Sequence, residues 1–552
     1  MRSMLHPARS ASCFLPEWLE RGRAWGVSLQ LYEIRSDRDW GIGDYADLAK
    51  LVTIAGEAGA SFVGLNPLHA LFLGEPNRRS PFSPSNRRFL NPLYIAVDKV
   101  DGFENGMVDE AVLSTLRSAR LVDYPGVAEV KLAGLRQIWR EQPAKIVDAD
   151  QQLRLHALFE ALSLQMVAQG FGAGWLAWPE EFHDPASAAV AQFATENADE
   201  INFQIWLQQI CREQLARAAS VAADAGMRIG LYLDFAVGEA PDGSATWGDK
   251  NLAVRGVSVG APPDVFTAEG QDWGLAPLSP EALEADDFAS YRGLMEAASR
   301  NAGALRIDHA MSLRQLFWIP KGAAPAEGIY VQYPLEGTIA ALAEISQRQK
   351  LVVIGEDLGH VPEGFRDTMA EAAILSYRIL YFEKSGSNFI APKDWLLLAL
   401  ACLSTHDLPT LKGWWAGDDI KLRAEHELIE AASASAQRHV RVRERRNLLI
   451  AFARAGLISK RVMRRLLVAR RLDDADYAAL ALAAHRYIAR TPSRLTAMRL
   501  ADAVGEFHPT NLPGTADEYP NWQRKLELTL EEVAESALFA RLTAALRKER
   551  PT

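Results

Sequence analysis

The stretch 303-GALRIDHAM-311 runs from short apolar residues directly into an aspartate and a histidine. Three further stretches repeat this pattern of an apolar run that ends in acids: 228-RIGLYLDFAV-237, 350-KLVVIGEDLG-359 and 397-LLALACLSTHDL-408. Segments with helical spacing of apolar residues lie along the same part of the chain. Fully apolar runs that alternate with helices indicate a parallel sheet that is covered on both faces.

The N-terminal part of the chain adds a strand–helix–strand unit to this pattern. The runs 25-WGVSLQLY-32 and 61-SFVGLNPL-68 flank a segment, residues 44–60, with apolar residues at helical spacing. At 552 residues we expect an α/β fold, a (β/α)8 barrel with mainly helical insertions, and the alternative is an open doubly wound sheet. The expected organisation is an N-terminal segment over 1–24, a barrel over 25–530 with insertions at about 100–200 and 415–490, and a C-terminal helix over 531–552.

Composition and charge exclude several classes of protein. With 60 basic and 70 acidic residues the net charge is −10, and 49% of residues are apolar, as in ordinary globular chains. We therefore expect neither a nucleic-acid nor a membrane partner, and we interpret the basic segments 441–446 and 464–471 as solvated helix surfaces. The three cysteines lie far apart and no signal peptide is recognisable, which favours a reducing, cytoplasmic location.

The acids at the ends of the apolar runs are the candidates for chemistry: Asp234, Asp308, Glu356 and Asp407. The carboxyl ends of barrel strands converge on one face, where active sites lie. A buried strand that ends in a carboxylate needs a reason, because desolvating a charge is costly. The series predicts a catalytic site, with a metal site or a structural ion-pair network as the alternatives.

Two carboxyl groups in different protonation states suit retaining glycoside chemistry, which places them about 5–5.5 Å apart. Arg306 would hold Asp308 ionised. Glu356 follows an apolar run and precedes the charged Asp357, which makes it the candidate for a raised pKa. A metal site would combine histidines and acids within one short span, and the sequence contains no such span.

The aromatic content agrees with a sugar substrate. The chain has 14 tryptophans, and sugar rings stack on such side chains. Trp273 in 270-GQDWGLAPLSP-280 and Trp414 lie in expected loops, so for these two we predict sugar contact rather than core packing.

At this point the sequence resembles the amylomaltases, which are bacterial 4-α-glucanotransferases or disproportionating enzymes related to the α-amylase clan. The resemblance extends from about residue 25 to 530 and rests on motifs in a fixed order. These motifs are 39-DWGIGDYADL-48, 80-SPFSPSNRRFLNPLYI-95, 230-GLYLDFAVG-238, 260-GAPPDVFTAEGQDWG-274, 305-LRIDHAM-311, 330-YVQYPLE-336, 354-IGEDLG-359, 404-STHDLPTLKGWW-415, 511-NLPGT-515 and 519-YPNWQRKL-526.

The resemblance implies a role for each acid. Asp308 matches the nucleophile, Glu356 the general acid/base, and Asp407 the third acid, which binds the donor sugar's 2- and 3-hydroxyls. It also implies a set of substrate-binding residues: Phe82, Asp234, Asp264, Gln271, Trp273, Arg306, His309, His406 and Asn511. Neither a metal nor a cofactor is expected.

Two departures from related patterns matter. The family commonly has tyrosine where this chain has Phe82, so the stacking ring is kept but its hydroxyl is missing. The Asn-His pair that follows the corresponding aspartate in α-amylases is absent after Asp234. The second departure disfavours an ordinary amylase.

The expected activity is therefore the transfer of α-1,4-glucan segments to the 4-hydroxyl of an acceptor. The expected partners are maltooligosaccharides, glucose and glycogen-like or starch-like glucans. A hydrolase that uses the same site is the first alternative, and a non-catalytic glucan-binding protein is the second.

Overall fold

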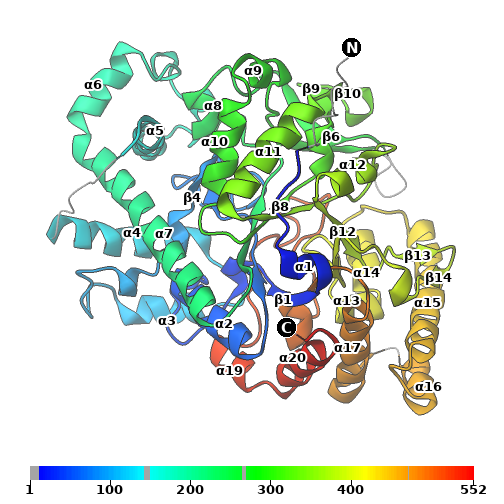
Figure 1. Cartoon of the computed structure of the whole chain (residues 1–552). Helices are drawn as coiled ribbons and strands as arrows, with labels where there is room; N and C mark the ends of the chain where they lie inside the picture. The colour runs from blue at the N-terminus through cyan, green and yellow to red at the C-terminus, as the bar shows by residue number, and fades with distance from the viewer. Residues whose placement is uncertain (1–10, 142–148, 264–268, 470, 552) are drawn as a thin grey trace, which may run out of the picture.

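The protein forms a closed barrel of eight parallel strands, in which each strand pairs with the barrel strands before and after it (Figure 1). The computed structural model describes residues 11–141, 149–263, 269–469 and 471–551. The first strand pairs with both the second and the last, which closes the barrel. The predicted (β/α)8 barrel is confirmed, and the open doubly wound sheet is excluded. The strands are β1 (Ala24–Ser28), β2 (Phe62–Gly64), β5 (Gly230–Phe235), β8 (Ala304–Ile307), β11 (Val352–Gly355), β12 (Leu375–Ile379), β15 (Ala399–Cys402) and β16 (Leu495–Arg499).

Helices on the outside of the barrel connect the strands and cover them. Asp44 begins the first of these helices, because its side chain accepts hydrogen bonds from the backbone N–H groups of Ala46 and Asp47. Buried residues then recur at helical spacing from Leu48 to Ala55, which is the face that packs on the barrel. These outer helices are α2 (Tyr45–Glu57), α7 (Ala198–Asp224), α10 (Ala289–Ala298), α11 (Leu335–Gln349), α12 (Phe365–Glu371), α17 (Asp474–Ala489) and α20 (Ala537–Glu549).

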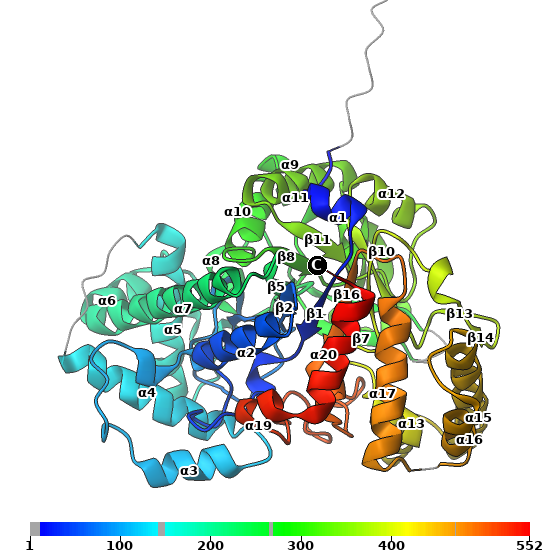
Figure 2. The ribbon, with the colours of Figure 1, turned by 60° about the horizontal axis from the view of Figure 1, so that its bottom comes forward.

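Two further groups of helices lie on opposite sides of the barrel (Figures 1 and 2). Between β2 and α7 the chain forms α3 (Glu110–Ser118), α4 (Tyr124–Glu141), α5 (Gln151–Ala168) and α6 (Ala188–Glu196). Between β15 and α17 it forms α13 (Leu411–Ala416), α14 (Asp418–Glu425), α15 (Ala431–Arg454) and α16 (Lys460–Val468). Both groups interrupt the alternation of strand and helix.

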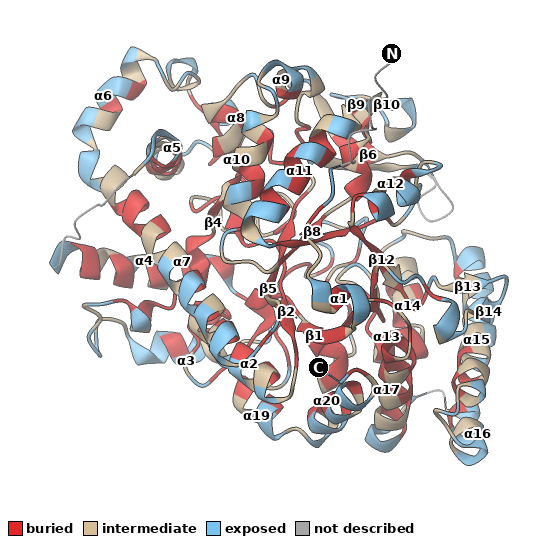
Figure 3. Ribbon diagram, viewed as in Figure 1, coloured by how far each residue is buried: buried red, intermediate tan, exposed pale blue. Residues whose placement is uncertain are grey.

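Burial is highest in the barrel strands and falls toward the outer helices, as Figure 3 shows. Every residue of β8 and of β11 is buried. A strand covered on both faces needs a continuous apolar run, which explains the runs in the sequence. No helix in the described part of the chain combines the length and the apolar character of a membrane span.

A small antiparallel sheet lies outside the barrel, with its strands in the order β10–β9–β6–β7. These strands are β6 (Val257–Ala261), β7 (Gln271–Leu275), β9 (Gln315–Pro320) and β10 (Ile329–Gln332). Strand β9 begins only a few residues after β8 ends, so this sheet starts close to the carboxyl end of the barrel. The hairpin β3 (His69–Ala70) and β4 (Asn86–Leu90) lies between β2 and α3, and the short helices α1 (Glu17–Arg21), α8 (Ser244–Gly248), α9 (Pro280–Ala285) and α18 (Leu500–Val504) join other elements.

The C-terminal part forms two helices, α19 (Leu530–Glu535) and α20, instead of the single helix expected over 531–552. Ser536 has an extended backbone, with φ −66° and ψ 118°, and its side chain accepts a hydrogen bond from the N–H of Phe539. A serine in this position caps a new helix rather than continuing the previous one. The break at Ser536 therefore explains the difference.

Candidate active site

Asp234, Arg306 and Asp308 form an ion-pair network at the carboxyl ends of β5 and β8. These strands pair with Asp234 opposite Arg306, so the two side chains lie at one level of the barrel. Nη1 of Arg306 donates to both carboxylate oxygens of Asp234, at 2.8 and 2.9 Å, and lies 2.9 Å from Oδ1 of Asp308. Asp234 and Arg306 are buried, whereas 17% of the Asp308 side chain is exposed.

The charge of Arg306 is maintained by the acids around it. Burial lowers the pKa of Arg306, but Asp234, Asp308 and Glu356 outweigh burial and raise this pKa well above its ordinary value. Burial, with the charge of Asp308, raises the pKa of Asp234 to about 6, and Arg306 opposes this rise. A fixed guanidinium charge therefore faces the carboxylates at neutral pH.

Glu356 lies beside Asp308 on the neighbouring strand. Strands β8 and β11 pair in parallel up to Ile307 and Gly355. The residue directly after each strand is an acid, so Asp308 and Glu356 lie next to each other at the carboxyl ends of the two strands. This juxtaposition follows from the register of the two strands.

The surroundings of Glu356 keep its carboxyl group protonated. The backbone N–H of His309 donates to Oε2 at 3.0 Å, and that of Leu358 donates to Oε1 at 2.9 Å. Burial and the charge of Asp308 raise the pKa of Glu356 to about 8, although Arg306 and the two N–H groups act in the opposite direction. Glu356 is therefore mostly a carboxylic acid at pH 7.

The raised pKa agrees with the sequence-based prediction for Glu356, but the cause does not involve Asp357. The buried carboxylate of Asp357 accepts hydrogen bonds from Ser376 at 2.6 Å, Arg366 at 2.7 Å and Arg378 at 2.9 Å. Two guanidinium groups thus compensate its charge. Neighbours in sequence point in different directions here, because alternate residues of an extended chain face opposite sides.

Asp407 forms a second polar group with His406 and Asn511. Nε2 of His406 lies 3.1 Å from Oδ2 of Asp407, and Nδ2 of Asn511 donates to Oδ1 at 2.7 Å. Burial acts to raise the pKa of Asp407, but His406, Asn511 and Arg306 outweigh it and lower this pKa to about 2. The side chain is also 46% exposed, so Asp407 offers an ionised carboxylate to a ligand.

Three rings gather beside this second group. The ring of Phe82 stacks on that of His406 with centroids 4.5 Å apart and an interplanar angle of 26°. Trp522 contacts both, at centroid distances of 5.5 and 5.4 Å. Phe82 and His406 are half-buried. An apolar surface of this kind can take the face of a sugar ring.

Trp273 and Gln271, both on β7, lie beside His309, the residue that follows Asp308. The Trp273 ring meets that of His309 edge to face at a centroid distance of 5.2 Å, and its Nε1 donates to Oε1 of Gln271 at 3.1 Å. His309 has a left-handed backbone with φ 44°, which directs its N–H toward Glu356. Strained residues of this kind cluster at functional sites. Asp264, also predicted from the sequence, lies outside the described residues.

One predicted sugar contact is wrong. Trp414 is only 3% exposed and packs inside the protein, stacked flat on Tyr381 with centroids 5.0 Å apart. The guanidinium of Arg441 covers its ring at 4.8 Å. The sequence-based prediction placed Trp414 in a loop, whereas it belongs to helix α13.

Sequence reasoning also missed three residues at this face: Tyr377, Arg499 and Trp522. The Tyr377 ring lies 5.5 Å from Cζ of Arg306. Arg499 donates to the backbone carbonyls of Thr405 and Leu408. Tyr377 and Arg499 lie on β12 and β16, whose short sequences, LSYRI and LTAMR, are interrupted by polar residues and so do not stand out as apolar runs. Trp522 lies in the motif 519–526, and this motif could have identified it as a candidate substrate contact.

The described ranges contain no group of three His, Cys, Asp or Glu side chains that could hold a metal ion. What they contain is a closed (β/α)8 barrel with ionised and protonated carboxyl groups at the carboxyl ends of its strands. This combination is typical of enzymes that act on glycosidic bonds.

Comparisons with known proteins narrow this class. The family model for 4-alpha-glucanotransferase matches residues 29–529, and the chain therefore belongs to this family. The 4-alpha-glucanotransferases of Mycobacterium tuberculosis and Haemophilus influenzae are 37% and 34% identical to it. These matches cover 97% and 93% of this chain and 76% and 77% of the relatives.

Solved structures agree with the family. Amylomaltase from Corynebacterium glutamicum has a TM-score of 0.84 at 30% identity, and the match covers 96% of this chain and 76% of that one. Amylomaltase from Streptococcus agalactiae, solved in complex with acarbose, has a TM-score of 0.72 at 18% identity over 96% and 99% of the two chains, and shows the same fold. The chain is thus an enzyme of the glucanotransferase family, and transfer is supported over the hydrolase alternative.

Proposed function

We propose that the protein transfers α-1,4-glucan segments by a retaining double displacement, with a glucosyl ester on Asp308 as the intermediate. The observation that carries this proposal is the side-by-side placement of Asp308, which contacts Arg306, and Glu356, whose pKa is raised to about 8. A retaining mechanism needs one ionised carboxylate as nucleophile and one carboxyl group that begins protonated.

The two half-reactions follow from these positions. The carboxylate of Asp308 attacks the anomeric carbon of the donor, the bond to the leaving 4-oxygen breaks, and Glu356 gives that oxygen its proton. The acceptor's 4-hydroxyl then attacks the same carbon, gives its proton to Glu356, and displaces the Asp308 carboxylate. The energy of one glycosidic bond is kept in the next, so no cofactor is required.

The remaining residues take supporting roles in this proposal. The ionised Asp407, oriented by His406 and Asn511, would bind the donor's 2- and 3-hydroxyls. Phe82 would stack on the donor ring beside His406. On the opposite side, Gln271 and Trp273 would contact the acceptor, and Asp264 is proposed with them from the sequence. Asp234 would hold Arg306 in place, and His309 would position Glu356 through its N–H.

Maltooligosaccharides and glucose are the proposed small substrates, and glycogen-like or starch-like glucans the proposed long donors. We place the reaction in the cytoplasm. All three cysteines are free and buried, which fits a reducing compartment.

Trapping the ester tests the assignment of the two acids. Asp308→Asn should abolish transfer and leave the fold intact, because the amide has nearly the same shape but is a poor nucleophile. Glu356→Gln should accumulate a covalent adduct when the donor is an α-glucosyl fluoride, whose leaving group needs no proton. Intact-mass spectrometry followed by peptide mapping should locate the added hexose on the peptide with Asp308. An adduct on any other peptide would overturn the assignment.

Product analysis with maltotriose tests transfer against hydrolysis. Transfer should give a ladder of longer and shorter chains with little gain of reducing ends. A gain of reducing ends without longer chains would instead show that water is the acceptor.

A further inference from the structure

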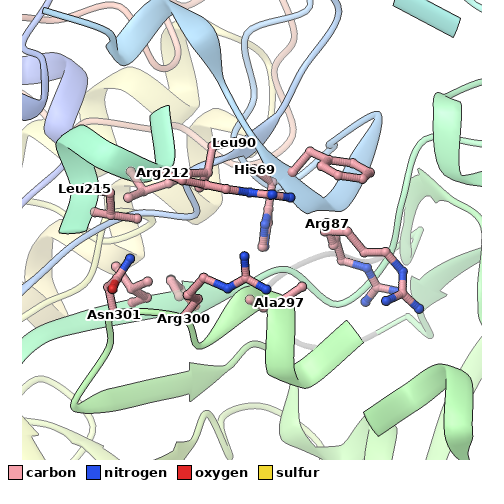
Figure 4. A pocket seen from close by; sticks show the side chains of 14 residues that line it. His69, Arg87, Leu90, Arg212, Leu215, Ala297, Arg300 and Asn301 are labelled. Atoms are coloured by element: carbon pink, nitrogen blue, oxygen red, sulfur yellow. The ribbon is translucent and has the colours of Figure 1, made fainter. Parts of the chain in front are cut away.

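A pocket of about 530 Å³, including its open mouth, lies between the outer helices α7 and α10 and strand β4 (Figure 4). Its walls include Leu215 on α7, Phe89 on β4 and Leu233 on β5. It contains none of the three acids Asp308, Glu356 and Asp407, and it shares only Asp234 with the site described above.

Four arginine side chains line this pocket: Arg87, Arg88, Arg212 and Arg300. Arg212 from α7 and Arg300 from the end of α10 reach toward the ring of His69, whereas Arg87 points away (Figure 4). Within the described ranges neither Arg212 nor Arg300 forms an ion pair. Arg88 also lines the pocket, and its Nη2 donates only to the carbonyl of Ser290, at 3.1 Å.

The positive charges of the arginines around this pocket lower one another's pKa values. Burial and the charge of Arg300 lower the pKa of Arg212, and Asp150 opposes this effect. Burial also lowers the pKa of Arg88, with Arg87 acting in the same direction and Glu239 against it. Positive charges that lie close together repel one another, and a bound anion would relieve this repulsion. Such an arrangement indicates a place for an anion.

The nearby carboxylates already have partners of their own. Asp234 is bound by Arg306 through both oxygens. Glu239 lies 3.3 Å from Nε of Arg87. Asp150 caps α5 by accepting the N–H of Leu153 at 2.7 Å. Among the described residues, none of these carboxylates forms an ion pair with Arg212 or Arg300, although Asp150 acts on Arg212 at longer range.

We propose that this pocket binds the phosphate group of a small phosphorylated sugar, with Arg212 and Arg300 as its principal ligands. The planar guanidinium group presents paired N–H donors that match phosphate oxygens. Arg88 adds a third positive charge at the same wall. The sugar ring lies against the apolar wall formed by Phe89 and Leu215. The site is separate from the transfer reaction and does not depend on its mechanism.

Isothermal titration calorimetry at constant ionic strength, with inorganic phosphate, glucose 6-phosphate and glucose as probes, tests this proposal. Both phosphate compounds should bind saturably, glucose should not bind here, and glucose 6-phosphate should bind more tightly than phosphate. Arg212→Gln and Arg300→Gln should each weaken binding by about tenfold, the effect of losing one charge-assisted hydrogen bond. Arg217→Gln is the matched control, because Arg217 is exposed on the same helix and does not line the pocket.

Activity on maltotriose should be unchanged in all three variants, which checks that they fold. If Arg212→Gln does not fold, Arg300→Gln still decides the result, since Arg300 is exposed. Absence of saturable binding by both phosphate compounds, or an equal loss in Arg217→Gln, would overturn the proposal. Binding of inorganic phosphate as tight as that of glucose 6-phosphate would overturn its sugar part.

Discussion

Arg306 is the positively charged residue that acts on all four acids of the site. It contacts Asp234 and Asp308 directly, and its charge opposes the raised pKa of Glu356 and helps to lower that of Asp407. One fixed positive charge thus lets neighbouring carboxyl groups hold different protonation states. The chemistry proposed for the site depends on that difference.

The pH dependence of transfer should show the raised pKa of Glu356. Glu356 must be protonated for the first half-reaction, so kcat/KM on maltotriose should fall tenfold per pH unit above about pH 8. With α-glucosyl fluoride as donor, which needs no proton, this alkaline decline should disappear. A decline that is identical for both donors would contradict the role of Glu356 as the acid.

The same shift affects the stability of the fold. The pKa of Glu356 rises from 4.5 to about 8 in the folded chain, so the folded state keeps a proton that the unfolded state loses. The contribution of this group to the free energy of unfolding should therefore be lost progressively as the pH rises from about 4.5 to about 8.

Phe82→Tyr should raise kcat modestly with little change in KM. Phe82 is half-buried and stacks on His406, so a phenolic hydroxyl could reach the donor sugar. One neutral hydrogen bond contributes about 0.5–1.5 kcal/mol, which corresponds to roughly two- to tenfold in rate if it forms mainly in the transition state. Disproportionation kinetics and the melting temperature should be measured together. A lower melting temperature with unchanged kcat would show that Phe82 has a packing role only, and Phe82→Leu, which removes the ring, is the control.

At the scale of elements, the motif that leads into α13 contributes one residue to the active site and another to the hydrophobic core. The segment 404-STHDLPTLKGWW-415 leaves the barrel as a loop with Asp407, and Thr410 then caps α13 by accepting the N–H of Gly413. Gly413 packs directly against the backbone at Phe507, because an added Cβ would be only 2.4 Å from the carbonyl oxygen of Phe507. The helix therefore packs tightly from its first turn, and this buries Trp414.

Arg499, the last residue of strand β16, holds the loop that contains Asp407. Its guanidinium donates to the carbonyls of Thr405 and Leu408, at 2.8 and 3.3 Å, and to Oγ1 of Thr510 at 2.6 Å. Thr405 and Leu408 lie on either side of Asp407 in the sequence, and Thr510 directly precedes Asn511. Strand β16 thus fixes the separation of two segments that contribute to one polar group.

Arg499→Lys should lower kcat by about tenfold or more, because a single ammonium group cannot replace the fork that holds both segments. Steady-state kinetics on maltotriose would measure this loss, with circular dichroism to check the fold. Arg443→Lys serves as the control, since Arg443 is exposed on α15. Equal kinetics for the two variants would show that the loop does not need Arg499.

At the scale of the whole molecule, the first and the last barrel strands pair to close the barrel. Strand β1 pairs with β16 from Ala24 opposite Leu495 to Ser28 opposite Arg499. Arg550, directly after α20, is fully buried and donates to the carbonyls of Ala24 and Ser493, at 3.1 and 2.7 Å. The closing pair of strands is thus held from outside by the C-terminal helix, which lies close to it in Figure 2.

Arg550→Ala should reduce the free energy of unfolding by at least about 2 kcal/mol, because it removes all the hydrogen bonds that this buried guanidinium donates, including those to the carbonyls of Ala24 and Ser493. Urea unfolding monitored by circular dichroism would show the lower midpoint. Lys548→Ala, at an exposed position of the same helix, should have no such effect. Equal midpoints for the two variants would mean that Arg550 does not stabilise the closure.

The sequence alone determined the barrel and the four acids, because both depend on local order along the chain. Each buried strand needs its own apolar run, and Asp308 and Glu356 each follow such a run directly, so they could be placed on one face before any contact was known. Only the tertiary structure decided the protonation state of Glu356 and the burial of Trp414. It also decided the support given by Arg499 and the meeting of Arg212 with Arg300. These properties depend on strand register and on contacts between residues far apart in the sequence, and no local pattern records either of them.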